Sequence, residues 1–557
     1  MNITRILVIA LIAVAIGGYF LFNLDQYLTL NYVQSRFAEI QQFQNENFTL
    51  TALIYFSVYV MIAALSIPGA AIISLLGGAI FGLGWGIIIV SFASSIGATL
   101  AFLVSRSLLR DWVQNRFGGY LALINRGIEK DGNFYLFSLR MVPLFPFFMV
   151  NLVMGLTPIR AGSFYAVSQA GMLLSTAVYV NAGSEMGQIS SLSELMSVPV
   201  IISLVLLGLF PLGARFLVGV IQRRSIMRKF SKPVWFDANV VVIGAGSAGL
   251  VASLIIARAK AKVILIEKNR MGGDCLNTGC IPSKSFIRSG RIMSYIRRAN
   301  EFGIDDASAD VNFSNIMARV NEIITKIEPH DSVERFTSLG VECVIGGARI
   351  ESPYTVSVNG RSINTRSIIL ATGARPIVPT IPGLEEIDYL TSDTVWSLQE
   401  LPRRLLVVGG GPIGCELAQA FHNLGSEVTQ VDMASRLLPR EDPEVSQAVM
   451  DKFIGDGIKV IIGCQLDSFG NDGGQLFIKI RHQQEELRIY FDNVLLAIGR
   501  KPNVEGFGLE ELGLSLTPQG SVQVDNAMRT AYPNIYACGD VATSYQFTHM
   551  ASFQAWF

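Results

Sequence analysis

The sequence has 557 residues, of which 50% are apolar and 16% are charged, and its mean hydropathy is +0.43. This length allows several domains, and the composition excludes both a single soluble domain and a disordered chain. Basic and acidic residues are equal in number, at 44 each, but residues 1–236 carry 15 basic and 8 acidic residues and the remainder carries 29 and 36. The two halves of the chain are therefore expected to differ in kind.

The first half is dominated by apolar segments of membrane-spanning length. The first of them, residues 6–22, follows Arg5 and is not followed by a small-residue cleavage site, so we expect an anchor instead of a removable signal sequence. Further apolar segments cover about residues 50–81, 82–104, 134–153, 164–180 and 198–220. The sequence therefore predicts an α-helical integral membrane domain over residues 1–222.

Basic residues between the segments predict the orientation, because Lys and Arg remain on the cytoplasmic side of a membrane. The basic linker, residues 223–237, places the following domains in the cytoplasm, beneath an inner or cell membrane. Arg126 and Lys130 precede the segment at 134–153 and Arg160 follows it. Both ends of that segment are therefore predicted to be cytoplasmic.

Two apolar segments are predicted to be broken in the middle. Pro143 and Pro146 interrupt one of them, and Pro68 followed by Gly69 interrupts another. Proline breaks a helix, and broken backbone is tolerated at membrane depth only where it lines a cavity. The sequence thus predicts two re-entrant elements that enter from opposite leaflets.

Arg140 and Asn151 flank one of these breaks. An arginine at membrane depth indicates a functional site, although its side chain could equally extend to the interface. This region resembles the DedA/VTT-domain (SNARE-associated) membrane family over about residues 40–220. The resemblance is carried by residues 66–70, 77–82 and 137–146, by Asn151 and by Gly155. It implies a lipid scramblase or a proton-dependent transporter that uses the motif arginine, but no Asp or Glu lies inside any segment, which argues against proton coupling.

The second half opens with a glycine pattern typical of dinucleotide sites. A buried strand at 240–243 leads into Gly244, Gly246 and Gly249, and a helix-compatible run follows. The first glycine permits a tight turn, the second lets the backbone approach a pyrophosphate, and the third lets the helix pack on the strand. Glu267 ends the next strand, where it could bind ribose hydroxyls.

The same pattern recurs at Gly409, Gly411 and Gly414, with Asp432 at the end of the second strand. In both copies the acid lies 23 residues beyond the first glycine. An acid at this position repels a ribose 2′-phosphate, so Asp432 favours NADH over NADPH. Arg436, four residues later, could complicate that preference. We therefore expect α/β architecture with two Rossmann-like domains.

All six cysteines lie in the second half, and only Cys275 and Cys280 are close together, which excludes a secreted disulfide framework. Their spacing permits a disulfide only if the intervening chain loops, for which residues 277–279 are suited. Pro282 at a helix start directs the helix dipole toward Cys280, which lowers the pKa of its thiol. The alternative is a pair of buried structural cysteines.

From about residue 237 onward the sequence resembles the class I pyridine nucleotide-disulfide oxidoreductases, and most closely their mercuric reductase and dihydrolipoamide dehydrogenase branch. The redox motif at 272–284 and the segments at 368–376, 495–503 and 535–540 carry the resemblance. The resemblance implies FAD and NADH as cofactors. It assigns FAD to Gly244, Gly246, Gly249, Glu267, Thr372, Gly373 and Asp540, NADH to Gly409, Gly411, Gly414 and Asp432, and catalysis to Cys275, Cys280, Lys284 and Glu416.

The implied mechanism passes a hydride from NADH to the flavin and then reduces the Cys275–Cys280 disulfide. Cys280 stays beside the flavin, Cys275 exchanges with the acceptor, and Lys284 pairs with Glu416 by the reacting ring edge. Family members continue beyond the Asp540 motif into an interface domain that forms a homodimer. We expect that domain to be absent here and the chain to be a fragment, and the four histidines to be non-catalytic.

The leading hypothesis is a membrane-tethered FAD-dependent NADH oxidoreductase with a thiol, disulfide, small-molecule or metal-ion acceptor. Mercury reduction itself is not predicted, since neither a second cysteine pair nor a metal-binding module is found. We expect membrane lipids as partners, no nucleic acid and no resident metal. The alternative is a DedA-like transporter or lipid scramblase with a regulatory or inactive flavin domain. The predicted flavin-domain parts are residues 238–400 and 501–557 for FAD and residues 401–500 for NAD.

Overall fold

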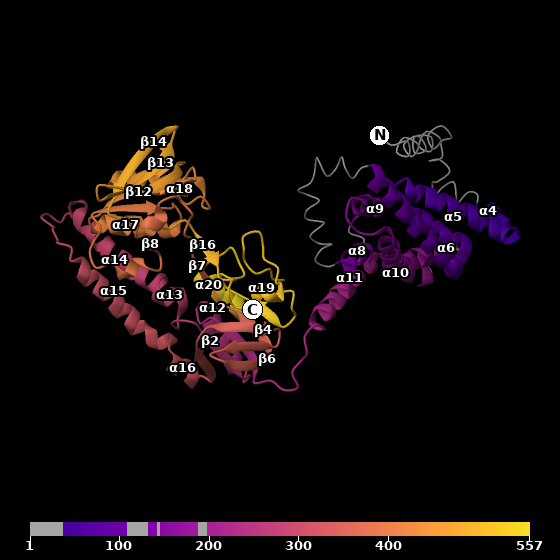
Figure 1. The fold of residues 1–557 in the computed structure, drawn as a ribbon, viewed down its shortest axis with the longest axis horizontal. Coiled ribbons are helices and arrows are strands. Elements are labelled where there is room, and N and C mark those ends of the chain that lie inside the picture. The colour runs from indigo at the N-terminus through magenta and orange to yellow at the C-terminus, as the bar shows by residue number, and fades with distance from the viewer. Residues whose placement is uncertain (1–36, 109–131, 142–144, 188–197) are drawn as a thin grey trace. The chain divides into compact units, whose positions relative to one another are not determined.

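The computed structural model describes residues 37–108, 132–141, 145–187 and 198–557 (Figure 1). The predicted anchor at 6–22, together with Arg126, Lys130 and Pro143, lies outside these residues. Contacts divide the chain into two compact units, one ending at Arg224 and one beginning at Ser225. The first unit is helical, and the second contains all the strands of the described structure.

The described part of the first unit is built from apolar helices. These are α4 (Phe37–Glu46), α5 (Phe48–Ala64), α6 (Ala70–Leu108), α8 (Asn133–Met141), α9 (Phe147–Gly155), α10 (Ala161–Gly187) and α11 (Val198–Met227), the last of which ends in the second unit. By length and composition, α6 and residues 201–221 of α11 could each cross a membrane. The pair α4 and α5, bent by 118°, would add a third span if it counts as one.

The helix breaks fall where proline and glycine predict them. Between α5 and α6, Ser66 and Gly69 adopt positive φ values of 59° and 139°, and Pro68 lies between them. Within α6, Gly82 has a φ of 68°, which separates the predicted segments 50–81 and 82–104. Pro146 precedes α9 as its N-cap. The interruptions are therefore present, and the re-entrant path through a membrane stays a prediction.

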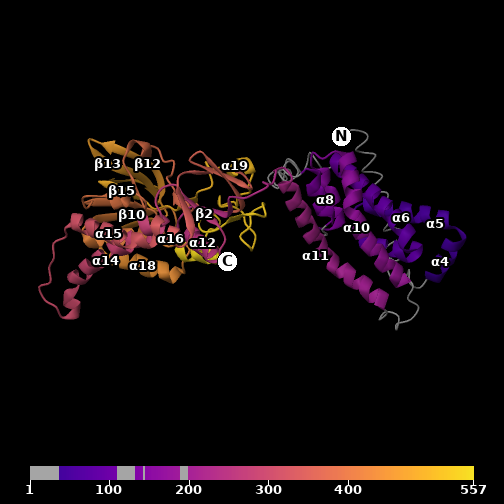
Figure 2. The ribbon, with the colours of Figure 1, turned by 90° about the horizontal axis from the view of Figure 1, so that it is seen from below.

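Small residues bring α6 and α10 into close contact (Figure 2). A Cβ atom at Gly78 would overlap the Val180 carbonyl oxygen, and one at Gly183 would overlap the Leu75 carbonyl oxygen. Helices associate in lipid through such close backbone packing, since no hydrophobic effect acts between them there. These two glycines therefore allow the main helix pair of the first unit to form.

The second unit begins with a seven-stranded sheet in the order β3-β2-β1-β6-β5-β4, with β17 also paired to β6. Its strands are β1 (Ala238–Ile243), β2 (Val263–Glu267), β3 (Val341–Ile345), β4 (Ala348–Ser352), β5 (Thr355–Val358), β6 (Arg361–Leu370) and β17 (Ile535–Ala537). Strands β3, β2, β1, β6 and β17 pair in parallel, whereas β4 and β5 are antiparallel additions. Helices α12 (Ser247–Arg258), α16 (Val333–Ser338) and α20 (Thr548–Trp556) pack against β1 and β2 through a shared core. The short helix α19 (Leu509–Leu512) joins the core that includes Val241 and Ile264.

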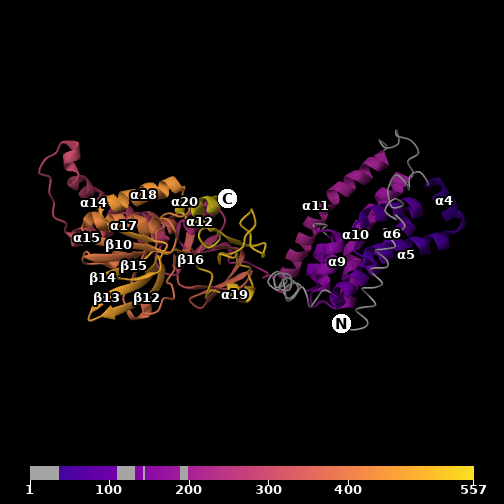
Figure 3. The same ribbon diagram turned by 90° about the horizontal axis from the view of Figure 1, so that it is seen from above.

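A second parallel sheet has the order β11-β10-β9-β15-β8. Its strands are β8 (Leu390–Thr391), β9 (Arg404–Val408), β10 (Glu427–Asp432), β11 (Lys459–Ile462) and β15 (Asn493–Leu496). Leu405 and Val407 face one core with α14 (Cys280–Arg297), α15 (Phe313–Ile327), α17 (Pro412–Leu424) and α18 (Pro443–Asp456). Leu406 and Val408 face another core with the antiparallel sheet of β12 (Gln465–Asp472), β13 (Gln475–His482) and β14 (Glu485–Phe491), as Figure 3 shows.

A short antiparallel pair, β7 (Ala374–Pro376) with β16 (Arg500–Pro502), joins the chain leaving the first sheet to the chain returning from the second. The second unit thus contains two Rossmann-like halves, and the multi-domain fold predicted from the sequence is confirmed. The half that contains the first sheet is discontinuous in sequence, because β17 pairs with β6 only after the chain has completed the second sheet.

Candidate active site

The first glycine loop connects β1 to α12. Gly244 has a φ of 103°, and a Cβ atom there would overlap the Ala371 carbonyl oxygen; one at Gly249 would overlap the carbonyl oxygen of Gly244. A Cβ atom at Gly246 would find its nearest atom 3.7 Å away. The first and third glycines are thus required by the fold, whereas a Cβ atom at the second would make only an ordinary van der Waals contact.

The second loop, between β9 and α17, repeats this arrangement. Gly409 has a φ of 120°, and a Cβ atom at Gly414 would overlap the Gly409 carbonyl oxygen, whereas one at Gly411 would contact nothing within 4 Å. Gly246 and Gly411 are the N-caps of their helices and make no side-chain cap hydrogen bond. A glycine cap leaves the N–H groups of the first turn without a side-chain partner, apart from the first position of α17, where Pro412 has no N–H. These free N–H groups fit a pyrophosphate at each helix N-terminus.

An acid at the end of the following strand, Glu267 in β2 and Asp432 in β10, holds each loop in place. Glu267 accepts hydrogen bonds from the backbone N–H groups of Ala245, at 2.7 Å, and Asn269, at 2.8 Å. Asp432 accepts from the N–H of Gly410 and from that of Ala434, the latter at 2.6 Å. Because each carboxylate oxygen can accept a second bond, both acids keep capacity for ribose hydroxyl groups.

The redox motif folds into two helices with a loop between them. Cys275 lies in α13 (Gly273–Asn277), and Cys280 is the first residue of α14. The Asn277 side chain holds the turn by donating hydrogen bonds to the carbonyl oxygens of Met271 and Gly273. The chain leaves the helix at Thr278, and both thiols are free and close enough for each to affect the pKa of the other.

The two thiols differ in acidity. The pKa of Cys280 is lowered to about 5, first by the hydrogen bond from Cys275 and then by the Thr548 hydroxyl and the charge of Lys284, against the effect of burial. The pKa of Cys275 is raised above its usual range, chiefly because it donates that hydrogen bond. The N-terminus of α14 also favours an anion at Cys280. Cys280 is therefore the cysteine that is present as a thiolate.

Lys284 and Glu416 approach each other where α14 packs against α17. Burial raises the pKa of Glu416, and the positive charge of Lys284 opposes that rise. Gly290 permits this packing, since a Cβ atom there would lie 3.0 Å from the Ala420 carbonyl oxygen. The charge of Lys284 thus acts on the Glu416 carboxylate, although within the described part of the chain the two side chains form no direct ion pair.

Asp540, Thr372 and Gly373 lie near the carboxyl ends of β17 and β6. Burial raises the pKa of Asp540, and the charge of Arg500 opposes that rise. The Thr372 hydroxyl donates to the Asn503 carbonyl oxygen at 2.7 Å, and the Gly373 carbonyl accepts from the Asn503 N–H at 2.9 Å. Thr372 and Gly373, two of the predicted cofactor residues, therefore also hold together the chain segments that connect the two sheets.

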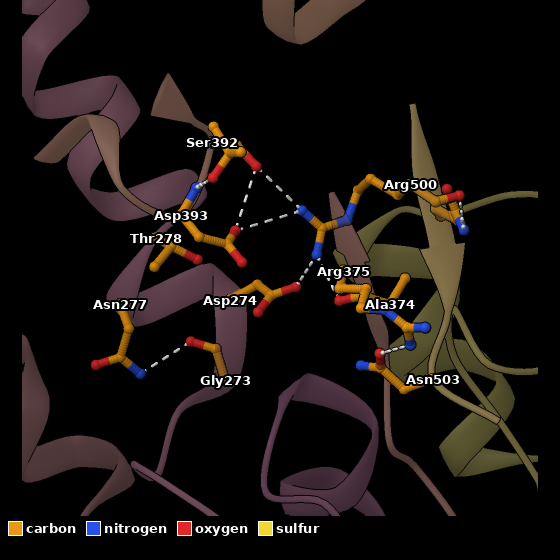
Figure 4. Close-up of polar contacts among 12 residues, drawn as sticks. Gly273, Asp274, Asn277, Thr278, Ala374, Arg375, Ser392, Asp393, Arg500 and Asn503 are labelled. Carbon is orange, nitrogen blue, oxygen red and sulfur yellow. Dashed lines mark hydrogen bonds and ion pairs between the residues drawn. The ribbon is translucent and has the colours of Figure 1, made fainter. Parts of the chain in front are cut away.

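Arg500 is the centre of a polar cluster that sequence reasoning missed (Figure 4). Its guanidinium donates to the Ala374 carbonyl oxygen at 2.7 Å and to the Ser392 hydroxyl at 3.3 Å, and it pairs with the carboxylates of Asp274 and Asp393. Its side chain is only 14% exposed. Asp274 immediately precedes Cys275, so this arginine ties the redox helix to β7 and to the loop after β8.

Two further residues support the cysteine pair from distant parts of the chain. The Thr548 hydroxyl lies 3.4 Å from the Cys280 sulfur, and α20, which carries it, packs against α12. The Trp396 indole N–H donates to the Thr278 carbonyl oxygen, at 2.8 Å, inside the loop between the cysteines. No local pattern signals either residue, because each lies more than 100 positions from its partner.

In the first unit, Arg140 is buried and neutral side chains surround it. It donates to the Asn151 side-chain oxygen at 2.7 Å and to the Ser168 hydroxyl at 3.1 Å, and its guanidinium lies over the rings of Phe147 and Phe164. Its residue is 6% exposed, so its side chain does not extend to the surface of this unit. Within the described residues it forms no ion pair with a carboxylate.

Comparison with protein families gives two matches. A family model for pyridine nucleotide-disulphide oxidoreductases matches residues 238–555, and a model for the VTT domain matches residues 67–185. The first match covers the two glycine loops and the cysteine pair, and the second covers Arg140 and both helix breaks. The two resemblances inferred from the motifs are confirmed.

Individual relatives agree with the first match. The chain is 33% identical to a mercuric reductase of Bacillus cereus over 57% of its own length and 51% of that protein. It is 36% identical to a dihydrolipoyl dehydrogenase of Chlamydia trachomatis, covering 57% of this chain and 68% of the relative. The matched region is thus about half the length of the mercuric reductase.

Among solved structures, a copper(II) complex of the HOCl-induced flavoprotein disulfide reductase RclA from Escherichia coli is similar. It superposes with a TM-score of 0.51 at 27% identity, covering 58% of this chain and 70% of that one. Together, the comparisons and the two uncapped glycine loops support the predicted dinucleotide fold.

Proposed function

Because this chain belongs to the pyridine nucleotide-disulphide oxidoreductase family, whose members are FAD-dependent and use NAD(P)H, we propose that it transfers electrons from NADH through Cys275 and Cys280 to an acceptor. The observation that carries the proposal is the acidic Cys280 thiol at the N-terminus of α14, close to Cys275 and in a motif that contacts the first glycine loop. The contact between Gly273 of the redox motif and Gly246 of the loop supports this placement. The chain also carries a VTT domain and associates with a membrane.

We assign the first glycine loop, Glu267, Thr372, Gly373 and Asp540 to FAD. Residues 238–400 and 501–557 would form its domain. The second loop and Asp432 would hold NADH within residues 401–500. When bound, FAD links the hydride chemistry of NADH to the two-electron chemistry of a disulfide. The uncapped N–H groups of α12 and α17 would orient the two pyrophosphates.

The cysteines would complete the transfer. Two electrons and two protons break the Cys275–Cys280 bond and give two thiols, of which Cys280 releases its proton. The Cys275 thiol then passes its proton to the Cys280 thiolate, and its sulfur attacks a disulfide acceptor, forming a mixed disulfide and releasing one thiolate, which takes up a proton from water. Cys280 attacks the Cys275 sulfur, which restores the original bond and releases the second thiol. Lys284 would stabilise the Cys280 thiolate electrostatically, and Glu416 would offset the charge of Lys284.

NADH is the preferred donor in this proposal, because one oxygen of the Asp432 carboxylate accepts from the loop N–H of Gly410, so that its negative charge lies beside the second glycine loop. Arg436, which could attract a 2′-phosphate, donates instead to the carbonyl oxygens of Pro439 and Glu441. We expect Asp432→Ser to lower kcat/KM for NADH by roughly tenfold, as one lost charged hydrogen bond would. The change should leave kcat/KM for NADPH equal or higher. An equal loss of kcat/KM with NADH and with NADPH would contradict the assignment of Asp432 to NADH.

The proposal is tested by anaerobic titration of the flavin-loaded chain with NADH. Wild-type protein should bleach and then show a long-wavelength absorbance band from a thiolate beside the flavin. Cys280→Ser should bleach without that band, whereas Cys275→Ser should show the band before any NADH is added, because its Cys280 is permanently free. A chain that retains no flavin, or whose flavin does not respond to NADH, would refute an enzymatic role.

The membrane unit supports a second candidate activity, the movement of an anionic lipid or solute. The buried Arg140, with only neutral hydrogen-bond partners, is the observation that favours it. Scrambling of fluorescent lipids in proteoliposomes should be lost in Arg140→Gln and partly kept in Arg140→Lys. We further propose that the membrane is the inner or cell membrane and that the flavin domain is cytoplasmic. The basic residues between Arg223 and Lys232 support this orientation.

A further inference from the structure

The second unit has an open groove, remote from the cysteines, with a volume of about 720 Å³. Its lining consists of residues 232–239 with Lys262 and Arg366. These residues come from the segment that follows α11, from the start of β2 and from β6. The groove is therefore formed by the segment that follows α11 and by the sheet whose strand β1 leads into the first glycine loop.

The groove lies at the end of β1 opposite to the nucleotide loop. Ala238 begins β1 and lines the groove, whereas Gly244 directly follows the other end of the strand. β2 runs parallel to β1, so Lys262, directly before β2, lies at the same edge. At about 3.3 Å per residue, the six residues of β1 separate the groove from the loop by roughly 20 Å. Occupation of the groove would not obstruct the loop.

The charge of the groove suits an anion. Lys232, Lys262 and Arg366 are exposed, and none of them forms an ion pair with a described carboxylate. The one acid in the lining, Asp237, accepts a hydrogen bond from the backbone N–H of Asn364 at 2.9 Å. Arg228 and Lys229, also exposed, precede the groove in the chain. The positive charges thus outnumber the negative ones on this face.

Apolar side chains accompany these charges. Val234 is fully exposed and Trp235 is 69% exposed, although both follow Pro233 in a well-anchored segment. Phe236 packs beneath the guanidinium of Arg366 at 5.4 Å, and the Asp237 N–H donates to the Asn364 carbonyl oxygen at 2.8 Å. An exposed tryptophan beside lysines is typical of side chains that lie at the headgroup level of a bilayer.

The chain keeps this face near the membrane whatever the orientation of the domain. The apolar part of α11 ends at Ile221, and the helix continues to Met227. Six further helical residues and five extended ones reach at most roughly 26 Å, so Lys232 cannot lie farther than that from the end of the apolar stretch. An anionic surface is therefore always within reach of the groove.

We propose that this groove binds the phosphate headgroup of an anionic phospholipid, with Val234 and Trp235 inserted at the interface. Lys232, Lys262 and Arg366 contact the headgroup, and the flavin domain is thereby docked on the membrane with its glycine loop directed away from it. The docked state requires neither NADH nor the cysteines, so it can be tested separately from the redox proposal.

The test uses the full chain in nanodiscs whose lipids carry bromine on their acyl chains, which quenches nearby tryptophan. The difference between wild type and Trp235→Phe isolates the signal of Trp235. Quenching should be strong in discs that contain phosphatidylglycerol, weak in discs of phosphatidylcholine alone, and reversed by high salt. At about 1 kcal/mol per basic residue, the variant Lys232→Gln/Lys262→Gln/Arg366→Gln should lower the docked-to-free ratio by roughly 100-fold.

A matched control removes three exposed basic residues elsewhere in the unit, as Lys326→Gln/Arg403→Gln/Lys459→Gln. It should keep wild-type quenching, which separates a local contact from a change in net charge. Flavin content and melting temperature report whether each variant is folded. Equal quenching in both lipid mixtures, or in the groove variant, would overturn the proposal. Release by inorganic phosphate, beyond the effect of chloride at equal ionic strength, would identify a small-anion site and would also overturn it.

Discussion

At the scale of single residues, the chemistry of the cysteine pair depends on which sulfur loses its proton first. Cys275, Thr548 and Lys284 all stabilise the Cys280 thiolate, and together they outweigh the opposing effect of burial. The proton remains on Cys275, whose pKa is raised. The Cys280 sulfur is therefore charged at neutral pH, and the Cys275 sulfur is not.

This difference predicts the pH dependence of the reduced protein. The pKa of Cys280 is lowered to about 5, so its thiolate persists from neutral pH downward and is protonated only as the pH falls through that value. We expect the long-wavelength band of the NADH-treated protein to be constant above about pH 6 and to disappear near pH 5. An acid titration of the absorbance measures this. Loss of the band near pH 8 instead would show an unperturbed thiol.

The role of Thr548 can be separated from that of its neighbours. Thr548→Val keeps the shape of the side chain but removes the hydroxyl 3.4 Å from the Cys280 sulfur. A hydrogen bond to a charged group contributes about 1.5 kcal/mol, so we expect the pKa of Cys280 to rise by roughly 1. The rate of alkylation of the reduced protein as a function of pH reports that value without any turnover.

Two further variants serve as controls for this experiment. Thr548→Ser should restore the wild-type pKa, because it returns the hydroxyl. Thr543→Val should have no effect on the thiol, since the Thr543 hydroxyl accepts from the N–H of Tyr545 and not from either cysteine. If Thr548→Val alkylates with the wild-type pH profile, the hydroxyl has no influence on the sulfur.

At the scale of elements, the two strand–glycine–helix motifs, which begin at β1 and β9, show how far a local pattern can predict structure. In each motif the first glycine adopts positive φ and the third contacts the strand. The acid, Glu267 or Asp432, closes the loop by hydrogen bonds. All of these contacts form within about 25 residues of sequence. The spacing of Gly244, Gly249 and Glu267 was therefore sufficient to predict the geometry of the loop.

The glycines of the second loop should differ in what their replacement costs. Gly411→Ala places a methyl group in open space, so we expect a change in stability below about 0.5 kcal/mol but weaker binding of NADH. Gly414→Ala drives a methyl group into the Gly409 carbonyl oxygen and should destabilise the fold by about 2 kcal/mol. Melting temperature and NADH titration measure the two effects. Equal melting temperatures for the two variants would contradict this division of roles.

The contacts that the sequence did not predict join elements far apart in the chain. Thr548 reaches Cys280, Trp396 reaches the carbonyl group of Thr278, and Arg500 reaches Asp274. The three-stranded sheet β12–β14 was missed for a related reason, because nothing in the sequence specifies which face of the second sheet it covers. Non-local packing decides these features, and the periodicity of a segment carries no information about it.

At the scale of the whole molecule, Arg500 connects parts of the second unit that belong to different sheets (Figure 4). It lies on β16, pairs with Asp274 before the redox cysteine and donates to the loop after β8. Burial raises the pKa of Asp274, and the charge of the Arg500 guanidinium opposes that rise. The position of the cysteine helix therefore depends on the join between the two sheets.

We expect Arg500→Gln to destabilise the second unit by about 1–3 kcal/mol. The value lies below that for a fully buried ion pair because the Asp274 side chain is 50% exposed. Thermal unfolding in detergent, followed by release of the flavin, measures the loss. Arg500→Lys keeps the charge but cannot reproduce the forked contacts, and should be intermediate. Arg500→Gln combined with Asp274→Asn should lose less than the sum of the single changes.

In the membrane unit, prolines and glycines were sufficient to predict where the helices break, as Pro68 and Gly82 show. They were not sufficient to predict the surroundings of Arg140, which Asn151 and Ser168 provide from separate helices. Composition alone identified the unit as a membrane domain, because apolar length is a property of each segment by itself. The polar side chains that surround Arg140 could be identified only from the folded structure.

The opposite placement of the groove and the glycine loop on β1 has a pharmacological consequence. An amphiphile that occupies the groove would leave the pyrophosphate cradle accessible about one strand length away. Such a compound would therefore leave the apparent affinity for the pyridine nucleotide unchanged, and would act on membrane docking alone.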